Sequence, residues 1–196
     1  RFRAEEIRYC LEQADVRLLF VADRFLRIDF IALLRQICPA VDQRLPDPGL
    51  PLLASVVVLG DDVPRGALSY REMLALGTTV DALDTDAVQP DDVLLMQFTS
   101  GTTAHPKGVM LTHHGMLRNA AAVAGRFNCR QDDRYYSARP FYHVAGTTLS
   151  LLAALTRGAC LLSSPAFDPG EALRVMSGEG CTLTSGNDTM FLMLLG

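Results

Sequence analysis

The chain lacks the sequence features of secreted, membrane-spanning and zinc-binding proteins. Its five cysteines are scattered without a C-x-x-C pair, and neither they nor the four histidines have the spacing of metal ligands. We therefore expect free cysteines and a reducing compartment, the cytoplasm. The longest apolar stretch, about residues 144–155, is too short and too polar to span a bilayer. The first six residues, RFRAEE, contain no apolar segment typical of a signal peptide.

An excess of basic charge is also absent. Lys and Arg together number 18 and Asp and Glu number 22, so the formal net charge is −4. This balance argues against a protein that binds nucleic acid through a basic face. Apolar residue types make up 49% of the 196 residues and charged types 20%, which is typical of a folded globular protein with a substantial core.

Strand-like and helix-like segments alternate along the chain. Short apolar runs predict strands at residues 17–21, 56–59, 93–98, 134–138, 159–162 and 181–185. Apolar spacing, with Asp29 and Asp168 as N-cap residues, predicts helices over residues 4–14, 30–37, 70–76, 113–126, 146–155 and 188–195, and another that begins at Pro169. This alternation predicts an α/β fold of largely parallel β-sheet layers flanked by helices.

The helix expected at residues 188–195 is apolar on every side. Such a helix is expected to be buried, yet nothing that follows it in this sequence could cover it. An uncovered apolar surface of this kind favours self-association.

The segment that follows the strand at 93–98 has the composition of a polyphosphate-binding loop. It reads TSGTTAHPKG over residues 99–108. Gly101 allows backbone N–H groups to turn toward one anion, and Lys107 adds a positive charge suited to phosphate. Hydroxyl donors, one of which can reach a metal ion, come from Thr99, Ser100, Thr102 and Thr103.

A Walker A loop is the nearest alternative, and its spacing does not fit. That loop requires G-x-x-x-x-G-K-[ST]. Counted from Gly101, this chain has Pro106 in place of the second glycine and Gly108 in place of the Ser or Thr. The spacing therefore excludes an ordinary P-loop NTPase.

The stretch LLMQFTSGTTAHPKGVMLTH resembles the phosphate-loop signature of the adenylate-forming (AMP-binding) superfamily. That superfamily includes acyl-CoA and aryl-CoA synthetases, luciferases and the adenylation domains of peptide synthetases. Ala104 stands where the family usually has glycine, and a positive φ at that position would cost on the order of 1 kcal/mol.

Three further stretches are similar to the same family. Residues 1–21 resemble a segment that precedes the phosphate loop, and residues 182–195 resemble a later one, although Asn187 and Asp188 replace its usual Val-Pro. Residues 139–146, RPFYHVAG, resemble the P-x-F-H-x-x-G motif typical of acyl-CoA synthetases. The resemblance therefore extends over nearly the whole chain.

The resemblance implies an ATP-dependent, AMP-forming acyl-CoA ligase. Such an enzyme activates a hydrophobic carboxylic acid, here expected to be a fatty acid, as an acyl-adenylate, using ATP and Mg²⁺, and transfers the acyl group to coenzyme A. By resemblance, residues 99–103 and Lys107 hold the β- and γ-phosphates, and Thr99 lies near Mg²⁺. Lys107 and His143 are the implied catalytic residues, with His143 between the carboxylate and the α-phosphate. A hydrogen-bonded structural role is the alternative for His143, and capping or surface roles are expected for His113 and His114.

Several family motifs do not occur in this sequence, namely the Thr-Glu pair, the ribose-binding Asp, the hinge and the C-terminal lysine. We therefore expect residues 1–196 to be an internal fragment, an incomplete portion of the N-terminal AMP-binding domain without the C-terminal domain. Residues up to about 90 would form a first α/β part, and residues from about 91 the phosphate-loop part. The fragment alone is expected to be inactive. The alternative is a naturally truncated, non-catalytic homologue that binds a nucleotide or a partner.

Overall fold

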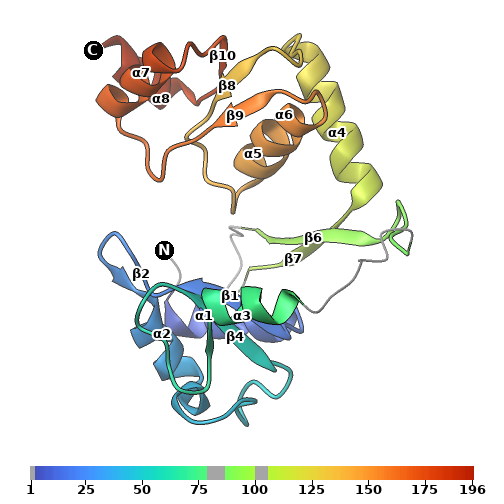
Figure 1. Cartoon of the computed structure of the whole chain (residues 1–196). Helices are drawn as coiled ribbons and strands as arrows, with labels where there is room; N and C mark the ends of the chain where they lie inside the picture. Colours follow the sequence, from blue (N-terminus) through green and yellow to red (C-terminus); the bar gives the residue numbers. More distant parts are fainter. Residues whose placement is uncertain (1–2, 79–86, 100–105) are drawn as a thin grey trace. The chain divides into compact units, whose positions relative to one another are not determined.

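The computed structural model describes residues 3–78, 87–99 and 106–196. The chain divides into two units, and each is described by itself. Unit 1 comprises Arg1–Ala87 and Phe98–Gly108, and unit 2 comprises Val88–Gln97 and Val109–Gly196. Helices and strands alternate along both units, as Figure 1 shows.

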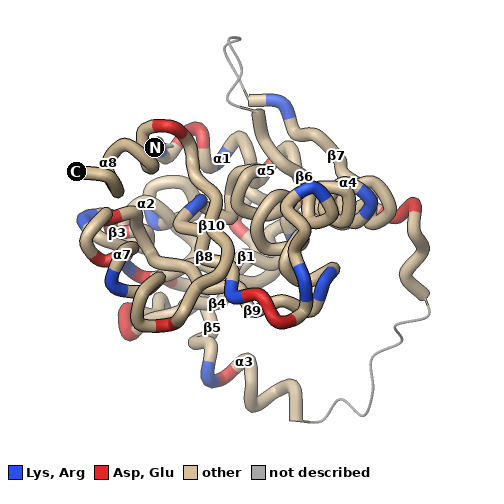
Figure 2. The backbone as a smooth tube through the Cα atoms, turned by 90° about the horizontal axis from the view of Figure 1, so that it is seen from above, with Lys and Arg blue, Asp and Glu red and all other residues tan. Residues whose placement is uncertain are grey.

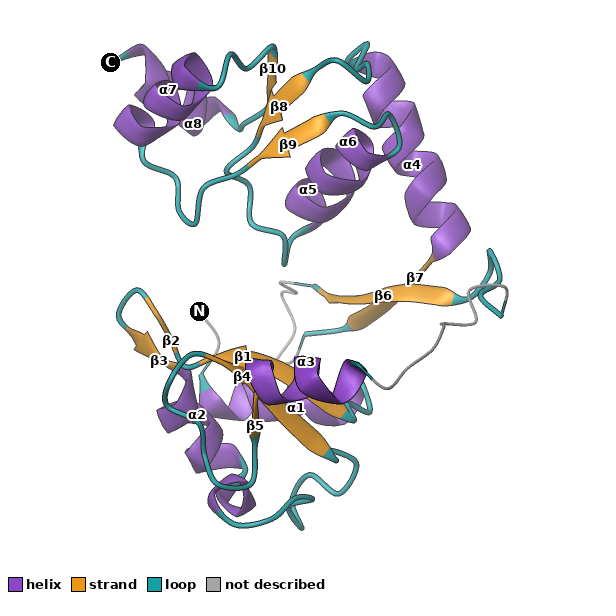
Figure 3. Ribbon diagram, in the orientation of Figure 1, coloured by secondary structure: helices purple, strands orange, loops and turns teal. Residues whose placement is uncertain are grey.

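A small parallel sheet forms the centre of unit 1. Its strand order is β1 (Leu18–Ala22), β4 (Ser55–Leu59) and β5 (Leu68–Ser69). The described residues of this unit also form a two-stranded ribbon and four helical segments (Figure 3): β2 (Arg24–Phe25), β3 (Ile28–Asp29), α1 (Ala4–Gln13), α2 (Phe30–Ile37), a 3₁₀ helix (Pro39–Asp42) and α3 (Tyr70–Gly77). The predicted α/β alternation is confirmed here.

The core of unit 1 lies between the sheet and helix α2. Val56 and Val58 of β4 point to this side, because alternate residues of a strand face the same side of the sheet. Ile31 and Leu34 of α2 pack against them. The side chain of Asp29 accepts a hydrogen bond from the Ala32 N–H at 2.8 Å, which confirms Asp29 as the N-cap of this helix.

Asp23 ties the ends of β1 and β4 together. Its carboxylate accepts backbone N–H bonds from Arg24 at 2.6 Å, Asp61 at 2.9 Å and Asp62 at 3.4 Å. These bonds, with that from Asp61 the strongest influence, lower the pKa of Asp23. Gly60 has a φ of +151°, and a Cβ there would lie 2.1 Å from the carboxyl carbon of Asp23. Only glycine fits this turn.

A second parallel sheet, in the order β10 (Leu183–Thr184), β8 (Arg134–Tyr136) and β9 (Cys160–Leu162), forms the centre of unit 2. Strands β6 (Val93–Phe98) and β7 (Gly108–Thr112) pair separately. The helices include α4 (His113–Arg126), α7 (Pro169–Gly178) and α8 (Asp188–Leu195). Asp168 caps α7 as predicted, accepting from the Glu171 N–H at 2.8 Å.

The helix predicted at residues 146–155 differs from the expectation in its start and its winding. It begins at α5 (Val144–Gly146), continues as a π-helix (Thr147–Leu152) and ends in α6 (Ala153–Leu155). The buried hydroxyl of Ser150 donates to the Ala145 carbonyl at 3.0 Å and bonds the Ser137 hydroxyl at 2.8 Å. Such side-chain bonds compete with the regular backbone bonds of an α-helix, which accounts for the irregular winding.

Helix α8 is not buried within the described chain, which agrees with the expectation of an uncovered apolar surface. The helix packs along α7, and no α8 residue is classed as buried. Leu192 and Leu195 are 69% and 86% exposed. Apolar residues on every side therefore make burial of a helix favourable, but the helix is buried only where other elements pack against each of its sides. In the described ranges, no helix has the length and apolar character needed to cross a bilayer.

Candidate functional site

Thr99 and Lys107 close the base of the predicted phosphate loop. The Thr99 N–H donates to the Lys107 carbonyl at 2.9 Å, and the Lys107 N–H donates to Thr99 Oγ1 at 3.3 Å. We call this residue pair the loop neck. Ser100, Gly101, Thr102 and Thr103 lie outside the described residues, as does Ala104. The structure therefore places the two ends of the predicted loop beside each other.

Both residues of the loop neck keep groups that a phosphate–metal complex could use. Within the described residues, Thr99 Oγ1 accepts one hydrogen bond, which leaves the hydroxyl its proton and a second lone pair toward them. Lys107, the only lysine in the sequence, is exposed and forms no ion pair with any residue of the described ranges. These donors fit a magnesium–polyphosphate ligand.

The backbone N–H groups at the start of helix α4 already donate hydrogen bonds to protein groups. Thr112 caps the helix by accepting from the Gly115 N–H at 3.1 Å. The N–H groups of His113 and His114 donate to the carbonyls of Asp92 at 3.1 Å and Pro90 at 2.8 Å. Because these N–H groups are occupied, the start of α4 offers little to an anion.

His143 stands at the beginning of helix α5 in unit 2. Its Nδ1 accepts a hydrogen bond from the Ala145 N–H at 3.1 Å, so His143 caps this helix. In the neutral ring, the proton therefore resides on Nε2. The side chain is exposed, which leaves Nε2–H as a donor to an external group. His143 can therefore cap the helix through Nδ1 and still donate a hydrogen bond through Nε2.

The turn before His143 is held by local hydrogen bonds. The Pro140 carbonyl accepts from the His143 N–H at 3.1 Å, and the Phe141 carbonyl accepts from the Thr147 hydroxyl. The His143 carbonyl accepts from the Gly146 N–H at 2.9 Å. A Cβ on Gly146 would lie 2.1 Å from the Pro140 oxygen. The glycine of this motif is therefore required by close approach of the backbone.

Two long-range bonds anchor the same turn, and sequence reasoning missed both. Arg139 Nη2 donates to the Gly186 carbonyl at 2.7 Å, and Gln97 Nε2 donates to the Tyr142 carbonyl at 2.9 Å. Arg139 belongs to the motif RPFYHVAG, so the sequence drew attention to this residue, but it did not predict the hydrogen bond to Gly186. Gln97 belongs to the quoted stretch LLMQFTSGTTAHPKGVMLTH, but its contact could not be predicted, because its partner is a backbone carbonyl that any residue supplies.

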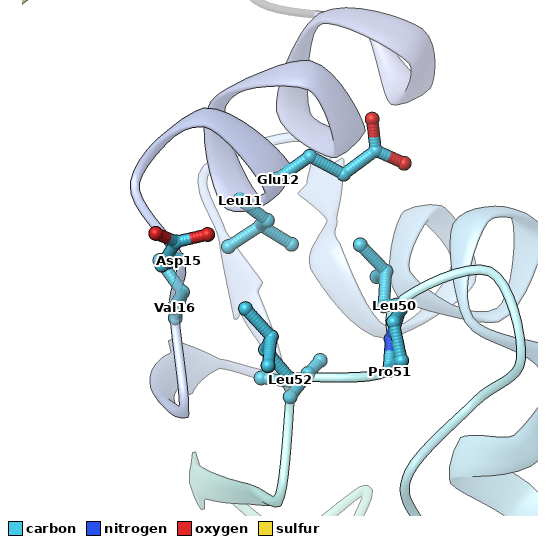
Figure 4. A pocket seen from close by; sticks show the side chains of 8 residues that line it. Leu11, Glu12, Asp15, Val16, Leu50, Pro51 and Leu52 are labelled. Carbon is cyan, nitrogen blue, oxygen red and sulfur yellow. The ribbon is translucent and has the colours of Figure 1, made fainter.

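A separate cavity of about 190 Å³ lies in unit 1 and contains none of the predicted site residues (Figure 4). Leu11, Val16 and the segment 50–53 form its apolar lining, with Glu12 and Asp15 beside them. Its two carboxylates would repel a polyphosphate. The chemistry of this cavity therefore does not suit ATP.

The described residues offer neither a metal cluster nor an activated buried thiol. They contain no group of three or more His, Cys, Asp or Glu side chains placed to hold a metal ion. Burial raises the pKa of the thiols of Cys10, Cys38, Cys129 and Cys181, which keeps them protonated.

Basic and acidic residues are interspersed along both units, as Figure 2 shows.

Comparison with known proteins gives consistent matches. A family model described as AMP-binding enzyme matches residues 1–196. The chain is 33% identical to the acyl-CoA ligase SID4 of Ajellomyces capsulatus, over 97% of this chain and 32% of that protein. It is 31% identical to the human mitochondrial medium-chain acyl-CoA ligase ACSF2, over 99% of this chain and 34% of that protein. The chain thus spans about a third of the length of these relatives.

A solved structure gives the same result at the level of the fold. The chain matches ATP-bound MatB from Rhodopseudomonas palustris with a TM-score of 0.72 and 26% identity, over 99% of this chain and 34% of that one. Its α/β units with parallel sheets therefore have the fold of the N-terminal domain of adenylate-forming enzymes. On the match over all 196 residues, the chain belongs to the family of AMP-binding enzymes.

Proposed function

We propose that this chain is the phosphate-loop portion of the large N-terminal domain of an ATP-dependent, AMP-forming acid–CoA ligase. The observation that carries the proposal is the loop neck, where Thr99 and Lys107 close a loop of phosphate-binding composition and Lys107 remains exposed. Membership of the AMP-binding family and the ligase names of the relatives support it.

The reaction has two steps. A substrate carboxylate oxygen attacks the α-phosphorus of ATP, an acyl–phosphate bond forms, and pyrophosphate leaves. The sulfur of coenzyme A, its proton lost to a base, then attacks the acyl carbon. A thioester forms and AMP leaves. Both steps need stabilisation of phosphate charge more than a covalent protein nucleophile.

The phosphate loop supplies this charge stabilisation. We assign binding of the β- and γ-phosphates to Lys107 and the loop residues Thr99, Ser100, Gly101, Thr102 and Thr103. Lys107 contributes an ammonium group that lies close in sequence to the hydroxyl donors. Thr99 would hold Mg²⁺ through its remaining lone pair, and the ion, when bound, would neutralise part of the charge on the leaving pyrophosphate.

His143 is assigned to the reacting carboxylate and α-phosphate. Its Nδ1 is engaged by the Ala145 N–H, which favours one orientation of the ring and leaves Nε2–H as the second donor position. A fixed N–H donor stabilises negative charge that develops on an oxygen without having to reorient during the reaction. In this role His143 orients the substrate and does not form a bond with it.

For the acid, we propose a hydrophobic, fatty carboxylic acid. The name of ACSF2 states medium-chain acyl groups for that relative, and the motif that contains His143 resembles that of acyl-CoA synthetases. The five cysteines are free, which supports a reducing compartment, and we propose the cytoplasm. We expect the 196-residue chain alone to be inactive, because the family's later motifs are not among its residues.

Analysis of the products tests this proposal. The complete protein that carries this chain is incubated with ATP, Mg²⁺, coenzyme A and octanoate, with acetate and benzoate as comparison acids. We expect octanoyl-CoA, AMP and pyrophosphate in equal amounts, and no AMP when the acid is omitted. ADP and phosphate formed without any acid would contradict the ligase assignment. ATP binding without turnover would favour the non-catalytic homologue.

A further inference from the structure

All four backbone carbonyls of the turn Pro140–His143 accept hydrogen bonds. Three of them accept from the turn itself or the helix that follows: Pro140 from the His143 N–H, Phe141 from the Thr147 hydroxyl, and His143 from the Gly146 N–H. The Tyr142 carbonyl instead accepts from Gln97, which lies 45 residues earlier. The position of the turn relative to a distant strand is therefore fixed through Tyr142.

This contact requires a side chain that donates a hydrogen bond, as the amide of Gln97 does. A backbone carbonyl is only an acceptor, so Gln97 must present its NH₂ group, which lies 2.9 Å from the Tyr142 oxygen. A glutamate would place an oxygen of similar geometry against the carbonyl oxygen and repel it. A methionine of similar length would fill the space and leave the Tyr142 carbonyl to water.

Each end of this bond lies close to a predicted site residue in the sequence. Gln97 lies on β6, two residues before Thr99 of the loop neck, and Tyr142 directly precedes His143. A shift of the Tyr142 carbonyl would move the backbone of His143 and with it the imidazole ring. The bond thus connects the strand that leads into the phosphate loop with the residue assigned to the reacting carboxylate.

We propose that Gln97 is a positioning residue, which holds the turn that carries His143 against strand β6 and so orients the residue that we assign to the acid. This inference rests on the proposed ligase function. It does not require Gln97 to touch a substrate. Loss of the bond should therefore weaken use of the acid while ATP binding through the loop is retained.

The test compares three variants of the complete protein. Gln97→Met removes the donor at similar length, Gln97→Glu introduces repulsion, and Gln13→Met at the exposed end of α1 is the matched control. Acid-dependent exchange of pyrophosphate with ATP gives separate KM values for acid and ATP. Hydrogen exchange of the amides in residues 140–147 reports the turn directly, and thermal unfolding reports general stability.

We expect Gln97→Met to raise the KM for the acid by about 2- to 10-fold, the effect of one lost hydrogen bond, with the KM for ATP changed by less than about 2-fold. The hydrogen-exchange rate of the 140–147 amides should rise by a similar factor. Gln97→Glu should raise both the KM for the acid and this exchange rate more than Gln97→Met does. Gln13→Met should change neither the KM for the acid nor the exchange rate.

Equal changes in both KM values together with a lowered Tm would indicate a merely structural residue and would overturn the proposal. Unchanged acid KM in both Gln97 variants would also overturn it. If the unmodified protein shows no acid-dependent exchange, the proposed function fails. Hydrogen exchange then still decides whether Gln97 holds the turn, so the two failures remain distinguishable.

Discussion

Gly146 and Pro140 approach each other so closely that a Cβ on Gly146 would lie 2.1 Å from the carbonyl oxygen of Pro140. The same Cβ would lie 2.8 Å from the carbonyl oxygen of Arg139. Both contacts are to backbone, which cannot move aside as a flexible side chain does. The turn before His143 therefore depends on the absence of a side chain at residue 146.

Gly146→Ala should destabilise the protein and displace this turn. The backbone must shift to accommodate the methyl group, and we expect a loss of about 1–3 kcal/mol in the free energy of unfolding, measured by urea denaturation. Gly178→Ala is the matched control at the end of helix α7, where a Cβ would meet nothing within 4 Å. It should be neutral or stabilising by up to about 1 kcal/mol. Equal stability of the two variants would refute the close approach.

Two variants of His143 separate its capping role from its proposed catalytic role. His143→Asn keeps an oxygen that can accept from the Ala145 N–H, whereas His143→Ala does not. We expect the Asn variant to unfold near the temperature of the original protein and the Ala variant to lose about 1 kcal/mol.

Both His143 variants lack the Nε2–H donor. Adenylate formation should therefore fall in both by about 10- to 150-fold, which corresponds to the loss of a hydrogen bond to a charged group. The rate is measured as acid-dependent pyrophosphate exchange. Full activity of His143→Asn would show that His143 serves only as a helix cap.

Asp23 should make stability depend on pH in the acidic range. Backbone N–H bonds from Asp61, Arg24 and Asp62 lower the pKa of Asp23 in the folded protein. A carboxyl group whose pKa is lower in the folded state stabilises that state above its unfolded pKa of about 3.9, and this contribution is lost as the pH falls through the lowered value.

Asp23→Asn, which keeps one acceptor oxygen without the charge, should therefore have a lower Tm than the original protein at pH 7. The difference should narrow as the pH falls below about 3.9. Asp132→Asn at an exposed position is the control, and thermal scans across this range provide the measurement. A Tm difference that does not change with pH would show that the Asp23 charge makes no contribution.

Much of the fold could be predicted because its signals are local. Asp29 and Asp168 are the N-caps that their sequence positions predict, since a cap needs only a side-chain oxygen and the next three residues. The two-residue strands β2, β3 and β5 were missed, because two residues carry no periodicity. The π-helix was missed, and the buried contact between Ser150 and Ser137 that accompanies it has no sequence pattern.

The site shows the same division. Thr99 and Lys107 could be found from composition and spacing, and the structure brings them together at the loop neck. Gln97 could not be found, because its contact with the Tyr142 carbonyl joins residues 45 positions apart and uses a group that every residue has. Contacts between a side chain and a distant backbone have no sequence pattern, so they become visible only in three dimensions.

Pyrophosphate exchange by the Lys107→Ala variant of the complete protein tests the central claim most directly. If Lys107 binds the phosphates of ATP, its removal should lower acid-dependent exchange by about 10- to 150-fold and raise the KM for ATP, because a hydrogen bond to a charged group is lost. Arg65→Ala, at another exposed cation of unit 1, should leave both quantities unchanged. Unchanged exchange with unchanged ATP affinity in Lys107→Ala would contradict the account.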